Sequence, residues 1–143
     1  MKSKLLAESP EKTFAVIFGS GDEAMAGLLS FAKENGLKAA HFTGIGAFED
    51  VTLGYFEWKT KQYARIPLRE QVEAISIAGD IALEKGEPKV HAHIVVGRYD
   101  GTTRGGHFLE GHVRPTLEII LVESPAILRR EMDEESGLAL IRL

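Results

Sequence analysis

The sequence predicts an α+β domain with a mainly antiparallel β-sheet, and three observations favour this fold class. Segments with the pattern of β-strands dominate the chain, one segment has the pattern of a well-capped helix, and short turns join successive strands. With many apolar strands and one good helix, one face of the sheet is left uncovered. We expect oligomer formation to cover that face.

Length and composition narrow the class of protein. The 143 residues fit a single domain over 1–143, and 44% hydrophobic residues are enough for a core. A formal net charge of -4 argues against a general affinity for nucleic acid or anionic membranes. There are no cysteines, so a metal must be held by histidine and carboxylate. No segment has the pattern of a signal peptide or a membrane span, which predicts a cytoplasmic protein.

The first two elements are a strand and a helix. Residues 14–18 are apolar on both faces, as in a buried strand. Ser20 and Glu23 have the spacing of a capping box, with Ser20 as the N-cap of the helix and Glu23 reaching back to it. Asn35 and Gly36 supply the stop signal. The apolar stripe of this helix consists of Ala24, Leu28, Phe31 and Ala32.

The next segments predict a bent strand and a hairpin. Residues 39–42 start a strand that the small residues 43–47 interrupt. This run lacks the glycine pattern of a phosphate-binding loop, so we interpret it as a turn or a bulge. Residues 51–58 and 63–66 form a hairpin that Pro67 ends. Its aromatic residues favour core and cross-strand packing over a platform for stacking nucleic-acid bases.

The second half of the chain predicts further strands around a histidine-rich stretch. Residues 73–83 are rich in β-branched side chains and form a strand. Residues 116–123 form another, on which Glu118 points away from its apolar neighbours and is either exposed or paired with an arginine. We expect a short helix within 124–135 and a final strand over 138–143.

The histidine-rich stretch, residues 90–112, holds four of the chain's five histidines. Its first segment, VHAHIVV, alternates as a β-strand does, so His91 and His93 share one face. Their Cα atoms lie about 7 Å apart at the rise of a strand. Two imidazoles at that distance can bind one metal ion.

A third histidine reaches the same face through a hairpin. Residues 99–101 suit a three-residue loop whose last position, a glycine, is left-handed. If Arg98 pairs with Thr102, counting outward places His93 opposite His107. The sequence therefore predicts a site made of three imidazoles.

Other residues of the stretch are weaker candidates. His112 lies an odd number of residues from His107, so it faces the other side of the sheet unless Gly111 is a bulge, and we leave it out of the metal site. Gly105 and Gly106 have no side chains to crowd the approach of a ligand or another backbone, or they form a bulge themselves.

Motifs across nearly the whole chain resemble one known family. They are HAH followed by RYDGTTRGGHFLEGHV, the earlier TGIGAFEDVTLGYF, the strand EAISIAGDIAL and the closing SGLALIRL. Together they resemble the PPC domain (plants and prokaryotes conserved domain) in its short, stand-alone prokaryotic form. The resemblance implies an antiparallel sheet flanked by helices, a homotrimer, and a metal bound by His91, His93 and His107.

The resemblance also brings a DNA-binding label. Plant members bind A/T-rich DNA through a separate Arg-Gly-Arg-Pro motif, and prokaryotic relatives are often labelled DNA-binding. This sequence has no such motif and a net charge of -4, so the DNA-binding role is disfavoured.

Three imidazoles without thiolate favour zinc, with nickel, cobalt or iron as alternatives. They leave one coordination position open, where zinc can lower the pKa of water to about 7. Three hypotheses follow, in order of preference. The first is a trimeric module that binds a metal or a small ligand and acts through protein partners. The second is a zinc-dependent hydrolase or lyase, and the third is a DNA-binding regulator.

The binding module ranks first because the sequence offers no convincing acid/base pair. Candidates for an acid/base group are Glu110, Glu118 or a group from a neighbouring subunit. The candidates for ligand contacts beside the metal are Gly105, Gly106, Glu110 and Glu118.

Overall fold

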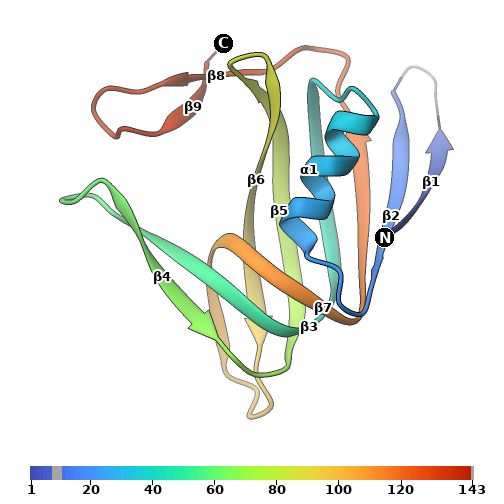
Figure 1. The fold of residues 1–143 in the computed structure, drawn as a ribbon, viewed down its shortest axis with the longest axis vertical. Helices are drawn as coiled ribbons and strands as arrows, with labels where there is room; N and C mark the ends of the chain where they lie inside the picture. The colour runs from blue at the N-terminus through green and yellow to red at the C-terminus, as the bar shows by residue number, and fades with distance from the viewer. Residues whose placement is uncertain (8–10, 143) are drawn as a thin grey trace.

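The computed structural model describes residues 1–7 and 11–142, and it is dominated by β-strands (Figure 1). The elements in this part of the chain are β1 Lys2–Ala7, β2 Thr13–Gly19, α1 Ala24–Glu34, β3 Ala39–Glu57, β4 Gln62–Leu68, β5 Val72–Glu84, β6 Glu87–Gly97, β7 Thr103–Glu123, β8 Arg129–Met132 and β9 Ala139–Arg142. None of the helices described is long and apolar enough to cross a membrane.

All nine strands belong to one sheet. The pairs β3–β5, β5–β6, β6–β7 and β7–β3 are all antiparallel and together close a circle. β2 and β1 extend the sheet beyond β7, β4 pairs with β3, and β8 pairs in parallel with β5. The prediction of a mainly antiparallel sheet is therefore confirmed.

The fold is more β-rich than the predicted α+β class, because only one helix, α1, lies within the described residues instead of several flanking ones. The predicted helix within 124–135 is wrong. This segment instead contains β8, whose backbone pairs with β9 and with the end of β5. The final strand is confirmed as β9, and Leu143 lies outside the described residues.

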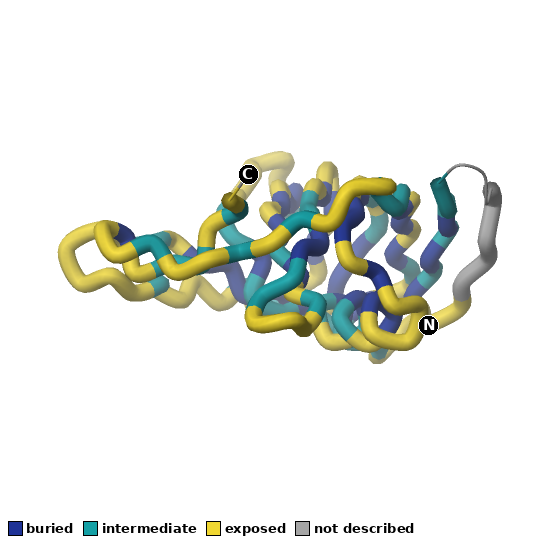
Figure 2. The backbone as a smooth tube through the Cα atoms, turned by 90° about the horizontal axis from the view of Figure 1, so that it is seen from above, coloured by how far each residue is buried: buried dark blue, intermediate teal, exposed yellow. Residues whose placement is uncertain are grey.

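The core lies between α1 and the sheet. The predicted apolar stripe of α1, namely Ala24, Leu28, Phe31 and Ala32, is buried. It packs with large side chains of the strands, among them Phe18 and Phe42, each almost fully buried. Figure 2 shows buried residues gathered in the body of the sheet, while the projecting hairpins are largely exposed.

The start of α1 differs from the prediction. Glu23 rather than Ser20 is the N-cap, and its carboxylate accepts hydrogen bonds from the backbone N–H groups of Met25 and Ala26 at 3.1 and 2.6 Å. The same carboxylate accepts one from Gly111 N–H at 3.0 Å. The side chain of Glu23 therefore caps α1 and also binds the backbone of β7. The predicted end of the helix at Asn35 is confirmed.

Two strands are longer than predicted. β3 runs for 19 residues through the small-residue run, with a register shift between Gly44 and Gly46, so the expected bulge is confirmed but the interruption is not. β7 runs for 21 residues, so residues 116–123 are its second half and not a separate strand. Pro67 does not end the hairpin but lies within β4, which pairs only with β3 among the described strands.

The hairpin of β3 and β4 projects from the sheet on the same side as the hairpin of β8 and β9 (Figure 1). Phe56 makes edge-to-face contacts with Trp58 and Tyr63. Tyr55 and Trp58 are 63% and 54% exposed, so the cross-strand part of the prediction is right and the core part is wrong for these two.

Candidate metal centre

The hairpin that joins β6 and β7 has the predicted register. Arg98 N–H donates to the carbonyl of Thr102 at 2.9 Å, and Gly101 has a φ of 80°, the left-handed conformation that favours glycine. Counting outward from this turn, His93 pairs directly with His107. Local turn chemistry therefore brings histidines from two strands together.

His91, His93 and His107 form one cluster. One nitrogen from each ring lies within 4.8 Å of the others, and the ring centroids are 5.0 to 5.4 Å apart. His91 and His107 are half-buried and His93 is exposed. Nδ1 of His107 is buried and has no hydrogen-bond partner among the described residues, as expected of a nitrogen aimed at a cation.

The surroundings of His93 and His107 favour the neutral form of both rings. Burial, and then the nearby His91 and His93, lower the pKa of His107 to about 4. Burial, and then the nearby His91, also lower the pKa of His93 below its usual value. Neutral rings are the form that binds a metal ion, so these three residues fit a divalent cation.

Two residues behind the cluster were missed by sequence reasoning. Asp80 on β5 pairs in register with His91, and its Oδ2 lies 3.6 Å from His91 Nδ1. Arg130 on β8 donates to the other oxygen of Asp80 and, at 3.2 Å, to the carbonyl of Ala139. The side chain of Arg130 is only 7% exposed.

The charge on Asp80 is stabilised by these contacts. Burial alone would raise the pKa of Asp80, but His91 and Arg130 outweigh burial and lower it below its usual value. An ionised Asp80 facing Nδ1 of His91 holds the proton on that nitrogen and leaves Nε2 free to bind a metal. The signal in the sequence was the one carboxylate in the apolar segment ISIAGDIAL.

A cavity of about 320 Å³ lies beside the cluster. His91 and His107 line it, together with Tyr63 from the projecting β4 and with residues of the β8–β9 hairpin. The ring of Tyr63 stacks on His107 with centroids 4.6 Å apart, and burial raises the pKa of the tyrosine. His91 and His107 therefore face a cavity and are not in contact with bulk solvent alone.

His112 lies apart from the cluster. Its Nδ1 is 3.0 Å from a carboxylate oxygen of Asp50, with which it forms a hydrogen bond. The register of β3 with β7 shifts between Phe108 and Glu110, so the bulge lies at Leu109 and not at Gly111. This extra residue puts His112 on the same face of the sheet as His107, so the predicted change of face is wrong, although His112 lies outside the cluster.

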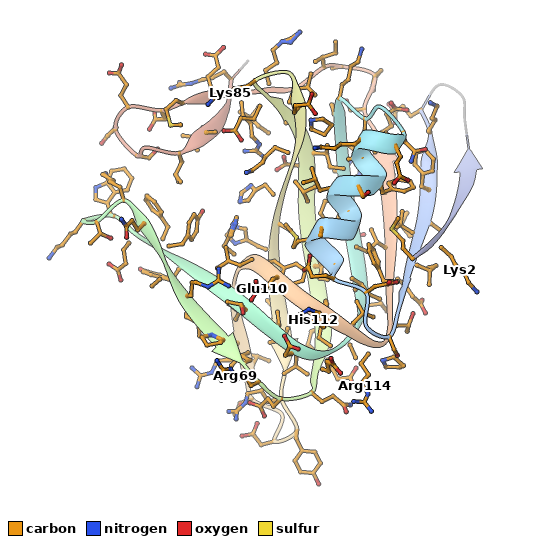
Figure 3. The ribbon with its side chains drawn as sticks, in the orientation of Figure 1. Lys2, Arg69, Lys85, Glu110, His112 and Arg114 are labelled. Carbon is orange, nitrogen blue, oxygen red and sulfur yellow. The ribbon has the colours of Figure 1, made fainter. Side chains whose placement is uncertain are left out.

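The remaining candidates do not line the cavity. Glu110 accepts a hydrogen bond from Thr52 at 3.0 Å and forms an ion pair with Arg65 at 3.0 Å (Figure 3). Glu118 is exposed on the second half of β7, as expected, and Arg114 pairs instead with Glu49.

The two glycines of β7 lie where strands approach closely. A Cβ on Gly106 would lie 2.7 Å from the carbonyl oxygen of Gly54 on β3, and a Cβ on Gly105 would lie 3.3 Å from that of Ile94 on β6. Of the two predicted reasons for glycine here, the close approach of another backbone is the one observed.

Comparison with known proteins gives consistent matches. The family model of the Plants and Prokaryotes Conserved (PCC) domain, also abbreviated PPC, matches residues 6–125. A plant- and prokaryote-conserved protein of Pyrococcus horikoshii has 34% identity and a TM-score of 0.87, with 99% of this chain and 95% of that chain covered. No curated protein matches the chain.

Two further solved structures carry different descriptions. A metal-containing protein from Archaeoglobus fulgidus has 30% identity and a TM-score of 0.84, with 92% of this chain and 94% of that chain covered. A protein provisionally labelled as DNA-binding, from Bacteroides thetaiotaomicron, has 26% identity and a TM-score of 0.88, with 98% and 96% covered.

Proposed function

The chain belongs to the Plants and Prokaryotes Conserved domain family, and we propose that it is a metal-dependent binding module for a small ligand. His91, His93 and His107 hold one divalent ion per chain. The observation that carries this proposal is three imidazoles whose ligand atoms lie within 4.8 Å of one another, one of them with a buried Nδ1 that has no hydrogen-bond partner among the described residues.

Zinc is the preferred ion because all three ligands are nitrogens and none is a thiolate. An ion held by three protein ligands supplies a Lewis-acidic position that a ligand oxygen can occupy. Other parts of the chain support this position: Asp80 orients His91, Tyr63 packs on His107, and the β8–β9 hairpin shields the cavity.

We further propose that the module is a homotrimer, as the family resemblance implies. Exposed apolar side chains support an interface: Ile45, Ile75, Val95 and Ile120 are 41% to 60% exposed. They come from β3, β5, β6 and β7, and Ile120 alternates with the buried Ile119 and Leu121. The exposed set therefore lies on the sheet face opposite the core.

Metal titration tests the function. Protein stripped with a chelator should bind one zinc or cobalt ion per chain, and the ion should raise the melting temperature, since a ligand that binds the native state stabilises it. His93→Ala should abolish both effects, while the matched control His112→Ala should keep them. Equal zinc binding by wild type and His93→Ala would refute the proposal.

A zinc-dependent hydrolase or lyase is the second candidate function. Tyr63 and Glu84 line the same cavity as His91 and His107, which supplies ionisable groups near the ion. This candidate requires turnover of a small substrate that chelation removes and zinc restores. Turnover that is equal in His93→Ala would eliminate it.

A further inference from the structure

We infer that the cavity beside the three histidines takes a small organic anion with one carboxylate head and a short apolar tail. The inference rests on the proposed metal site and names the class of its ligand. It draws on the charge balance of the cavity, on its small supply of hydrogen-bond donors and on its apolar wall.

The charge balance favours an anion. Imidazole nitrogens bring no negative charge to a metal ion, so a site made of three of them leaves both charges of a divalent ion uncompensated. The two cationic side chains of the wall are already paired: Lys89 Nζ lies 3.8 Å from Glu84, and Arg130 donates to Asp80. Among the described residues that line the cavity, Glu84 is the one carboxylate, and it is the partner of Lys89. A metal-loaded cavity therefore keeps a net positive charge that an incoming anion neutralises.

The supply of donors favours a carboxylate over a phosphate. Phosphate sites in proteins present several free N–H groups to the anion. Here Nη1 and Nη2 of Arg130 already donate to Ala139 and Asp80, and its Nε, which has no partner among the described residues, is buried. A single carboxylate can be satisfied by the ion and one further donor. Lys89 lines the same cavity, and its Nζ, at 3.8 Å from Glu84, is beyond direct hydrogen-bond distance of that carboxylate.

The rest of the wall is apolar. Val90 on β6 and Met132, Leu138 and Leu140 of the β8–β9 hairpin line the cavity. The volume of about 320 Å³ is at the small end of ligand sites, which fits a molecule with a short tail. Burying that tail against these side chains contributes affinity and selects against a bare inorganic anion.

The two projecting hairpins bound the cavity at its outer side. A Cβ on Gly137, in the β8–β9 turn, would lie 3.9 Å from the Cβ of Lys61 in the β3–β4 turn. The tips of the hairpins thus meet, and both contribute to the wall, through Tyr63 from one and Leu140 from the other. A ligand in the cavity is enclosed by both.

Calorimetric titration of the zinc-loaded full chain with hexanoate tests the inference, with hexan-1-ol and inorganic phosphate as comparison probes. Hexanoate should bind at least about tenfold more tightly than either, since only it combines the anionic head with the apolar tail. Leu140→Ser should weaken hexanoate binding by about tenfold, and the matched control Ile127→Ser, an exposed aliphatic residue outside the cavity, should not.

Metal content, measured on the same samples, separates this inference from the proposed function. If each chain holds one zinc ion but hexanoate binds no better than hexan-1-ol, or Leu140→Ser binds it as well as wild type, the ligand class is wrong and the metal site stands. If phosphate binds as tightly as hexanoate, the carboxylate preference is overturned. If no zinc is held, the proposed function itself has failed.

Discussion

Asp80 is the residue on which the orientation of His91 depends, because its carboxylate faces His91 Nδ1 and is held in turn by Arg130. Asp80→Asn keeps the shape of the side chain but removes the charge that fixes the proton on Nδ1. We expect zinc affinity to fall by about 10- to 100-fold, the usual effect of losing such a partner. Competition with a chromophoric chelator measures the change.

Asp50→Asn is the matched control, because Asp50 also faces a histidine, His112, but away from the cluster. It should leave zinc affinity unchanged. Wild-type affinity in Asp80→Asn would mean that Asp80 does not position the metal ligand.

His112 predicts a pH dependence of stability. The hydrogen bond to Asp50 raises the pKa of His112 above its usual value of 6.5. A group with a raised pKa in the folded state contributes stability that is fully present below about pH 6.5 and is lost as pH rises through the folded-state pKa. The pair is partly exposed, so the contribution should stay below about 1 kcal/mol.

Urea denaturation at pH 6 and pH 9 checks this expectation. The difference in the free energy of unfolding between wild type and Asp50→Asn should be larger at pH 6 than at pH 9. A difference that is the same at both pH values, or larger at pH 9, would contradict the assigned role of the pair.

At the scale of elements, Glu23 joins the start of α1 to β7. Glu23→Ala removes acceptors for the N–H groups of Met25, Ala26 and Gly111, and should lower the free energy of unfolding by about 1–2 kcal/mol. Ser20→Ala is the control and should change stability little, because Ser20 does not cap the helix. If chemical denaturation showed that both variants lose the same free energy of unfolding, this result would support the capping box predicted from the sequence instead.

Elements set by local signals were predictable, and elements set by distant contacts were not. The histidine hairpin follows from alternation and a glycine turn, both of which are local, so the pairing of His93 with His107 could be derived from spacing. β8 forms only because the chain returns to the end of β5 and pairs with β9. The sequence of β8 carries no local signal for this pairing, so the polar segment on its own predicts a helix.

The same distinction explains which parts of the candidate site were found. The three histidines lie on one hairpin and were identified together. Arg130 reaches Asp80 across 50 positions of sequence, and spacing cannot reveal such a contact. The bulge at Leu109 could not be predicted from the sequence either, because the pairing of β7 with β3 determines its position.

At the scale of the whole molecule, the uncovered sheet face predicts self-association. Light scattering coupled to size exclusion should give about 47 kDa, three times the 15.7 kDa chain. Ile120→Lys, on the exposed apolar face, should shift the protein toward monomer, whereas Ile127→Lys should not. A wild-type mass of one chain would contradict the proposed homotrimer.

An anomalous difference map from crystals of the zinc-loaded protein, recorded on both sides of the zinc absorption edge, would locate the metal ion directly. We expect one peak per chain at about 2.0–2.1 Å from one nitrogen each of His91, His93 and His107. No peak at this cluster, or a peak at His112 and Asp50 instead, would contradict the proposed metal site.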